Sequence, residues 1–194
     1  MATPESGGTA HLSGAASMRV LAHPTRLRLL ALLRERGPQT AALLGEVVDE
    51  APGTVSYHLS RLASIGLIQE APDAGTDRRE RWWRPTHALT SWEPADLLGD
   101  PAALAASTAL QRAIVQAYAS SFTQYLETVP TLPAEWVRAS PSSDRMLRLT
   151  VAELAELRID LELLTDKYES TSAAHSPADG SERVTLIYQA YRTP

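Results

Sequence analysis

Apolar residues recur every three or four positions in the first third of the chain, which is the spacing of a helix with one buried face. The spacing predicts helices over residues 15–22, 24–36 and about 40–48. His23 stands before Pro24, and the residue before a proline is pushed out of the helical conformation, so the first two helices are separate. We expect His23 to form a hydrogen bond at the start of the second helix.

The next stretch predicts a helix and then a hairpin. Pro52 suits a first helical turn and Gly66 suits a C-terminal cap, so a fourth helix is expected over residues 52–65. The strand-like segments 67–70 and 78–84 then flank a glycine-containing turn, which is the pattern of a β-hairpin. Short helices followed by a hairpin form a winged helix-turn-helix.

A long alanine-rich helix is predicted from residue 101 to about 128. Its apolar residues step by three and four positions along one face, and its alanines allow another helix to approach closely. We therefore expect it to be the dimerisation element, together with the helix over 15–22. The predicted apolar stripe consists of Leu110, Ile114, Tyr118, Phe122, Tyr125, Leu126 and Val129.

The last fifty residues predict a small α/β appendage. Residues 146–150 and 183–191 alternate between apolar and polar positions, so we expect two strands that pair with each other. Thr150 and Glu153 have the spacing of a capping box, which opens a helix with an apolar seam up to Tyr168. A flexible loop is expected over 170–182.

These elements divide the chain into three regions. Residues 1–14 predict a disordered leader, residues 15–94 a winged helix-turn-helix domain, and residues 95–194 a long helix with an α/β C-terminal region. The predicted fold class is mainly α with small β elements. The C-terminal region has two alternative roles, dimer support and sensing of a small-molecule effector.

The composition excludes several classes of protein. With 194 residues, 44% of them hydrophobic, the chain can bury a core. It has no cysteine, and therefore no disulfide framework, thiolate metal site or cysteine nucleophile. No apolar run approaches the roughly 18 residues of a membrane span, and the first residues lack the charge and apolar block of a secretory signal. We expect a cytoplasmic protein without a membrane partner.

The net charge of −5 is unevenly distributed. Residues 15–94 hold 10 arginines and 9 acidic residues, whereas residues 95–194 hold 8 basic and 13 acidic residues. The acidic total argues against broad electrostatic binding of nucleic acid. A local footprint remains compatible with it, because salt screens charges beyond roughly 10 Å.

The helix over 52–65 carries an unusual outward face. On a helical wheel its apolar residues point inward, and the opposite face is small, hydroxyl-bearing, aromatic and cationic. Such a face suits a helix that enters a major groove with its N-terminus first, although a solvated surface helix is the alternative. The candidate DNA-binding residues of this helix are Gly53, Thr54, Ser56, Tyr57, Ser60 and Arg61.

Two sequence blocks carry a family resemblance. Ala51-Pro-Gly-Thr-Val-Ser-Tyr-His-Leu-Ser-Arg-Leu-Ala-Ser-Ile-Gly-Leu-Ile68 resembles the recognition-helix block of ArsR-type winged-helix repressors. Leu21-Ala-His-Pro-Thr-Arg-Leu-Arg-Leu-Leu30 resembles the helix start that precedes it in that family. The resemblance covers about residues 15–90. It implies a dimeric bacterial transcription factor that binds DNA sequence-selectively, more as a repressor than as an activator.

The predicted hairpin adds candidate phosphate contacts. Arg78, Arg79 and Arg81 lie on or beside it, where arginines can meet the DNA backbone or the minor groove. A solvated charge run, which also contains Asp77 and Glu80, is the alternative. The adjacent Trp82 and Trp83 face opposite ways on a strand, and we expect one of them to pack beneath the hairpin.

The sequence predicts no metal, cofactor or catalytic site. Metal-sensing relatives have cysteines on the helix before the turn, or acidic and histidine ligands on the last long helix. Here residues 40–49 contain no thiol and the helix over 101–128 contains no histidine; the five histidines show no i,i+4 pairing. No nucleophile–base set or phosphate-binding glycine loop is present, so an enzyme is disfavoured. The expected function is a homodimeric transcriptional regulator that reads an operator in double-stranded DNA. A winged-helix adaptor that binds only proteins is the alternative.

Overall fold

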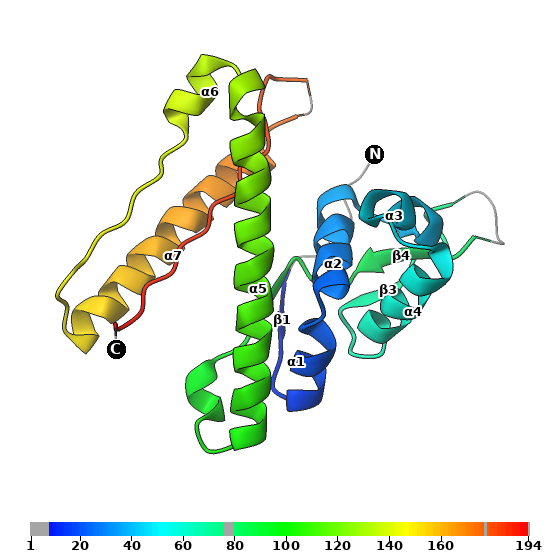
Figure 1. Ribbon diagram of the computed structural model, residues 1–194, viewed down its shortest axis with the longest axis horizontal. Helices are drawn as coiled ribbons and strands as arrows, with labels where there is room; N and C mark the ends of the chain where they lie inside the picture. The colour runs from blue at the N-terminus through cyan, green and yellow to red at the C-terminus, as the bar shows by residue number, and fades with distance from the viewer. Residues whose placement is uncertain (1–7, 76–79, 177, 194) are drawn as a thin grey trace. The chain divides into compact units, whose positions relative to one another are not determined.

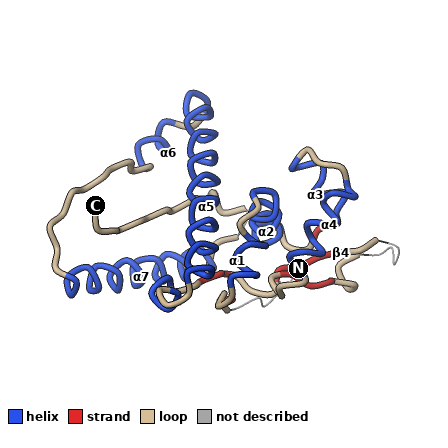
Figure 2. The backbone as a smooth tube through the Cα atoms, turned by 60° about the horizontal axis from the view of Figure 1, so that its bottom comes forward, coloured by secondary structure: helices blue, strands red, loops and turns tan. Residues whose placement is uncertain are grey.

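The chain forms two compact units in a computed structural model, which describes residues 8–75, 80–176 and 178–193. Unit 1 spans Met1–Thr128 and unit 2 spans Val129–Pro194 (Figures 1 and 2). The compact unit that contains the winged domain thus extends through the long helix, past the boundary at residue 94 that the sequence indicates.

Unit 1 is built mainly from helices. The predicted helices over 15–22, 24–36, 40–48, 52–65 and 101–128 are all present, with ends that differ by no more than two residues. They are α1 (Ala15–Leu21), α2 (Pro24–Arg36), α3 (Ala41–Val48), α4 (Pro52–Ala63) and α5 (Pro101–Thr128), and a 3₁₀ helix, η1 (Pro94–Leu97), precedes α5.

Local chemistry accounts for the helix starts. The His23 ring nitrogen Nδ1 accepts a hydrogen bond from the Thr25 amide at 3.2 Å, as predicted. Thr40 Oγ1 accepts one from the Leu43 amide at 3.2 Å, and Asp100 Oδ1 accepts from the Ala102 and Ala103 amides. These side chains satisfy amides that have no partner inside their own helix.

An antiparallel sheet in the order β2-β4-β3 forms the wing. It contains β2 (Gln39–Thr40), β3 (Ile68–Glu70) and β4 (Trp82–Pro85). Trp83 is paired with Glu70 on one side and with Gln39 on the other, so the hairpin is tied to the residues just before α3. Unit 1 is therefore a winged helix-turn-helix followed by a long helix, which confirms the predicted fold class.

Part of the segment predicted as a disordered leader forms a strand in a second, two-stranded sheet. β1 (Thr9–His11) pairs in parallel with β5 (Leu89–Ser91), and Ser91 Oγ lies 2.8 Å from His11 Nδ1. Residues 9–12 are thus ordered, because Ala10 and Leu12 are buried in the core and the backbone of the strand is hydrogen-bonded. Residues 1–7 of the predicted leader lie outside the described residues.

The core of unit 1 lies between α1, α2, α4 and α5. Met18, Leu29, Leu59 and Leu110 come from these four helices and are each fully buried. Trp92 Nε1 donates a hydrogen bond to the buried Ser107 Oγ at 2.9 Å, which fixes α5 to the segment after β5. The first third of α5 is thus part of the domain core.

Unit 2 contains η2 (Val129–Thr131), α6 (Ala134–Ala139) and α7 (Val151–Ala173). The capping box is confirmed, since Thr150 Oγ1 accepts from the Glu153 amide and Glu153 Oε2 accepts from the Thr150 amide. The Thr150 contacts lower the pKa of Glu153, because they favour its charged form. Helix α7 continues to Ala173, into the segment predicted as a loop over 170–182.

The two predicted strands of the appendage are absent. Residues 146–150 and 183–191 form neither a strand nor a ladder in the described part of unit 2. Their alternating apolar side chains are exposed, and no described residue of unit 2 is buried. Alternation marks side chains that favour burial, but a strand forms only where another strand supplies the hydrogen bonds. No described helix is long and apolar enough to cross a membrane.

Candidate nucleic-acid interface

Helix α4 is held against the domain by its inward face. Val55, Leu59 and Leu62 are fully buried, as the helical wheel predicts. Pro52 occupies the first turn, and Gly66 has φ +73°, which ends the helical segment in the left-handed region that favours glycine. One side of the helix is thus fixed to the core and the other is left to the solvent.

The turn between α3 and α4 depends on a close backbone approach. A Cβ atom on Gly45 would lie 2.6 Å from the Glu50 carbonyl oxygen, closer than such contacts normally come. Asp49 adopts a left-handed conformation with φ +58° at the end of α3. The absence of a side chain at Gly45 lets the turn fold back on α3, which sets the direction in which α4 leaves.

The predicted outward face of α4 is open to the solvent. Tyr57 is 59% exposed, and the Ser60 hydroxyl donates a hydrogen bond to the Ser56 carbonyl at 2.9 Å. The helix carries no acidic residue. All six candidate residues of the helix are exposed, namely Gly53, Thr54, Ser56, Tyr57, Ser60 and Arg61. Their part in binding stays a prediction.

The wing is shorter than predicted, and its described arginines are paired. Strand β4 begins at Trp82, so Arg81 precedes the strand, and Arg78 and Arg79 lie outside the described residues. The Arg81 guanidinium forms an ion pair with Glu70, and its carbon Cζ lies 4.6 Å from the centre of the Trp83 ring. Arg84 pairs with Asp73. Carboxylates on and beside β3 therefore compete for these cations.

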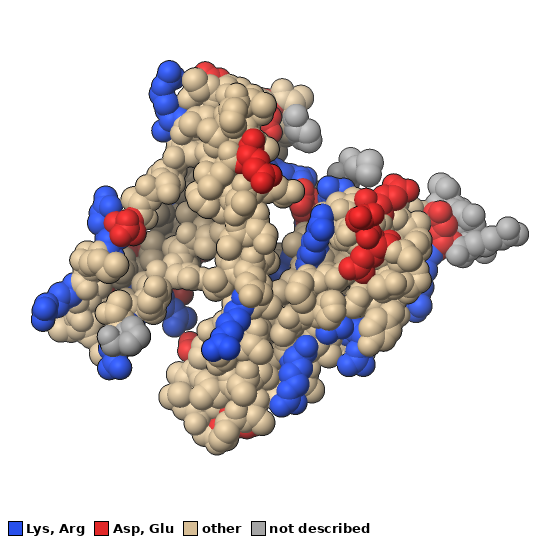
Figure 3. Space-filling model, viewed as in Figure 1, with Lys and Arg blue, Asp and Glu red and all other residues tan. Residues whose placement is uncertain are grey.

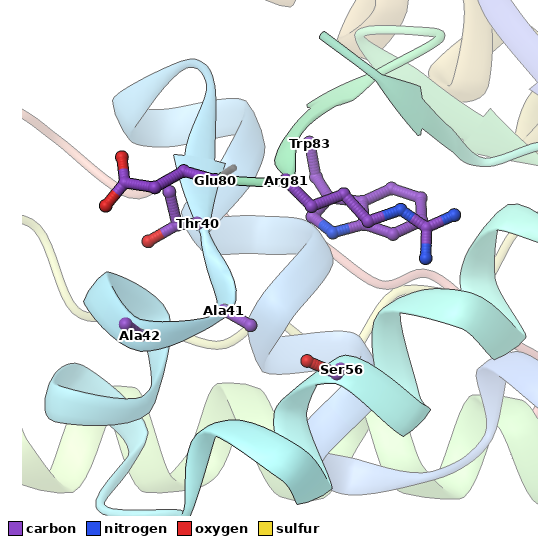
Figure 4. Close-up of a pocket in the computed structure, with 7 residues that line it drawn as sticks. All are labelled: Thr40, Ala41, Ala42, Ser56, Glu80, Arg81 and Trp83. Carbon is purple, nitrogen blue, oxygen red and sulfur yellow. The ribbon is translucent and has the colours of Figure 1, made fainter. Parts of the chain in front are cut away.

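A hollow of about 220 Å³ separates the wing from the two helices of the helix-turn-helix. Figure 4 shows the Arg81 side chain stacked along Trp83, with the Glu80 carboxylate directed away from them. Thr40 and Ser56 contribute hydroxyl groups from the start of α3 and from α4. Trp83 is buried, so it is the tryptophan that packs beneath the hairpin.

A polar cluster lies behind α4. His58 is buried, its ring centre lies 4.6 Å from that of His23, and its Nε2 lies 3.9 Å from Glu50 Oε2. Thr25 Oγ1 donates to Glu50 Oε1 at 2.7 Å. Burial lowers the pKa of both histidines; the charge of Arg26 also lowers both, and Glu50 opposes this. The sequence places His58 beside the inward face, but nothing in it indicates that His23 lies next to it.

The fold and this face define the class as a winged helix-turn-helix domain. A helix-turn-helix domain family matches residues 21–70, from the end of α1 to the end of β3. No curated protein matches the chain. Within the described residues, no group of three or more His, Cys, Asp or Glu side chains could hold a metal ion.

The chain also resembles solved structures of mutants of Lactococcus lactis ZitR. The apo form of a double mutant has 18% identity and a TM-score of 0.34, over 76% of this chain and 83% of that one. A second structure of the double mutant has 18% identity and a TM-score of 0.33, over 75% of each chain. A single mutant has 19% identity and a TM-score of 0.34, over 74% of this chain and 73% of that one. Values this low leave the assignment at the level of the helix-turn-helix domain.

Proposed function

We propose that the protein is a dimeric, non-enzymatic transcriptional regulator of the ArsR type that binds an operator in double-stranded DNA. The observation that carries this proposal is the two-sided character of α4, with an apolar face in the core and an acid-free polar face in the solvent. The match of residues 21–70 to a helix-turn-helix domain supports it.

Each residue of the outward face has a proposed role. Gly53, Thr54 and Ser56 are small enough to let the N-terminus of α4 approach the major groove, and helix amides and hydroxyls bind phosphates. Tyr57 and Arg61 lie further along the helix and reach base edges. A guanidinium can donate two hydrogen bonds to O6 and N7 of a guanine.

The wing supplies the proposed backbone contacts. Arg81, together with Arg78 and Arg79, meets phosphates in this proposal. The exposed ion pair between Arg81 and Glu70 is weak enough to be exchanged for a phosphate, because solvated pairs contribute roughly 0–1 kcal/mol. The wing then adds affinity with little sequence preference.

The proposed dimer uses the outer part of α5. Tyr118, Phe122 and Leu126 form an apolar stripe that is between 43% and 53% exposed. Contiguous exposed apolar surface of this kind marks an interface, and a second copy of the chain is the partner that gives a two-fold arrangement of recognition helices. By the resemblance to ArsR-type proteins, the dimer acts as a repressor.

The test compares Arg61→Ala with wild type on the promoter region of the protein's own gene and on a scrambled duplex. Removal of a base contact should cost about 1–3 kcal/mol on the operator and reduce discrimination between the two duplexes. Arg36→Ala is the matched control, since Arg36 lies at the far end of α2. If Arg61→Ala binds the operator with wild-type affinity and selectivity, α4 is not the recognition helix. If wild type binds no duplex, the protein is an adaptor and not a DNA-binding regulator.

A further inference from the structure

A second hollow of unit 1 gathers positive charge that the recognition face does not explain. It has a volume of about 410 Å³ and lies between α1, the start of α2 and the end of α4. Arg19, Arg26 and Arg61 line it, together with Tyr57, Ser64 and small apolar side chains. Among the described residues, none that lines it is acidic. We call it the arginine pocket.

The three arginines come from three different helices. Arg19 belongs to α1, Arg26 to α2 and Arg61 to α4, so the tertiary fold brings them together. Arg26 is half-buried, and its Nε donates a hydrogen bond to the Val20 carbonyl at the end of α1. This bond fixes the plane of the guanidinium, whose two terminal nitrogens carry four further donors.

Arg26 is partly desolvated in this pocket. Burial is the main cause that lowers its pKa; Tyr57 opposes the shift, and the positive charge of Arg61 adds a smaller lowering. Positive charges that lie close together repel each other, and an anion between them relieves this repulsion. A bound oxyanion would offset the repulsion and would accept hydrogen bonds from more than one guanidinium.

The helices that form the pocket also favour an anion, because two of them contain no acidic residue. Neither α1 nor α4 contains an Asp or Glu residue. Figure 3 shows Lys and Arg side chains of unit 1 around α1 and α4, whereas an acidic patch lies over α3. On this face of unit 1, positive and negative side chains are therefore separated, and the arginine pocket is formed by α1, α2 and α4.

We propose that the arginine pocket binds a backbone phosphate of the DNA duplex that α4 reads, so that the footprint extends beyond the recognition helix to α1 and α2. This inference rests on the proposed function. Tyr57 and Arg61 belong to both the outward face of α4 and the pocket, so a duplex held by α4 brings its backbone to Arg19 and Arg26. Most of the side chains that line the hollow are exposed, which suits a phosphate that remains part of a polymer.

The experiment measures the affinity of wild type, Arg19→Gln and Arg26→Gln for operator and scrambled duplex at several salt concentrations. Each Gln variant should weaken both duplexes by the same factor, because phosphates carry no sequence information. The slope of log affinity against log salt should shrink by about 0.9 for each phosphate that the variant no longer binds, and by twice that in a dimer. Arg36→Gln, which removes a charge outside the pocket, should leave the slope unchanged, and Arg19→Lys should retain most of it.

A competition arm separates the two sources of phosphate. At constant ionic strength, millimolar inorganic phosphate should not displace the duplex from wild type. Displacement that Arg19→Gln abolishes would assign the pocket to a free anion and overturn the inference. The inference about the pocket is also overturned if wild type binds the operator selectively and both Gln variants keep the wild-type salt dependence; the proposed function then stands. If wild type binds no duplex, the proposed function and the inference about the pocket are both wrong. A thermal melt of each variant shows whether it is folded.

Discussion

Both units contain many apolar side chains, but many of these are buried in unit 1 and most are exposed in unit 2. In unit 1, apolar residues from α1, α2, α4 and the first third of α5 are buried together. In unit 2, Met146 and Val151 are 85% and 88% exposed, and none of the described residues is buried. Unit 1 thus has a core of its own, whereas the apolar surface of unit 2 has no cover within that unit. Apolar content alone does not tell a core from an interface.

The sharpest test of this contrast truncates one leucine in each unit. Leu59→Ala removes a fully buried side chain from α4 and should lower the free energy of unfolding by about 2–5 kcal/mol. Leu163→Ala removes a side chain of α7 that is 62% exposed and should change it by less than about 0.5 kcal/mol. Urea denaturation followed by tryptophan fluorescence and circular dichroism measures both. Equal decreases in the free energy of unfolding for the two variants would show that α7 is buried in the protein in solution.

The next test concerns the exposed stripe on α5. Phe122→Asp places a charge in the proposed dimer interface and should reduce the mass in light scattering from twice 21.0 kDa to 21.0 kDa. Operator affinity should fall on the order of 10²-fold, because two linked recognition helices bind more tightly than one. Gln124→Asp, on the opposite side of the same helix, is the matched control. A wild-type mass of 21.0 kDa at high micromolar concentration would refute the dimer.

The smallest expected effect is a pH dependence confined to unit 1. Burial and nearby positive charges lower the pKa of His23 and His58 from the ordinary value of 6.5. The unfolded chain then binds more protons than the folded chain near and below pH 6.5, so stability should fall as the pH drops through 6.5 and should level off at higher pH. Thermal melts should show a flatter profile for His58→Gln. A profile for His58→Gln that is identical to that of wild type would exclude this cause.

Local signals in the sequence predict most of unit 1. The prolines that begin α2 and α4, the glycine after α4 and the spacing of Val55, Leu59 and Leu62 are local signals, so the helices and the inward face of α4 follow from them. The capping box of α7 is equally local. These features need no knowledge of distant parts of the chain.

Features that depend on distant residues do not follow from such signals. Strand β1 is three residues long and is stabilised by residues eighty positions later, so it has no periodicity of its own. The segments 146–150 and 183–191 have a clear alternation but no strand beside them. The arginine pocket combines three helices, and the pairing of Arg81 with Glu70 crosses the wing. Sequence patterns indicate which side chains favour burial, whereas the tertiary fold determines which of them are in contact.

The packing of α5 against α1 has a consequence for synthesis of the chain. Met18 of α1 is made about 90 residues before Leu110, and both are fully buried in the same core. At roughly 5–20 residues per second, ribosomes leave α1 without its cover for about 5–20 s. The winged region therefore emerges from the ribosome before it can finish folding, and a message cut short after residue 94 would yield a chain with an open core.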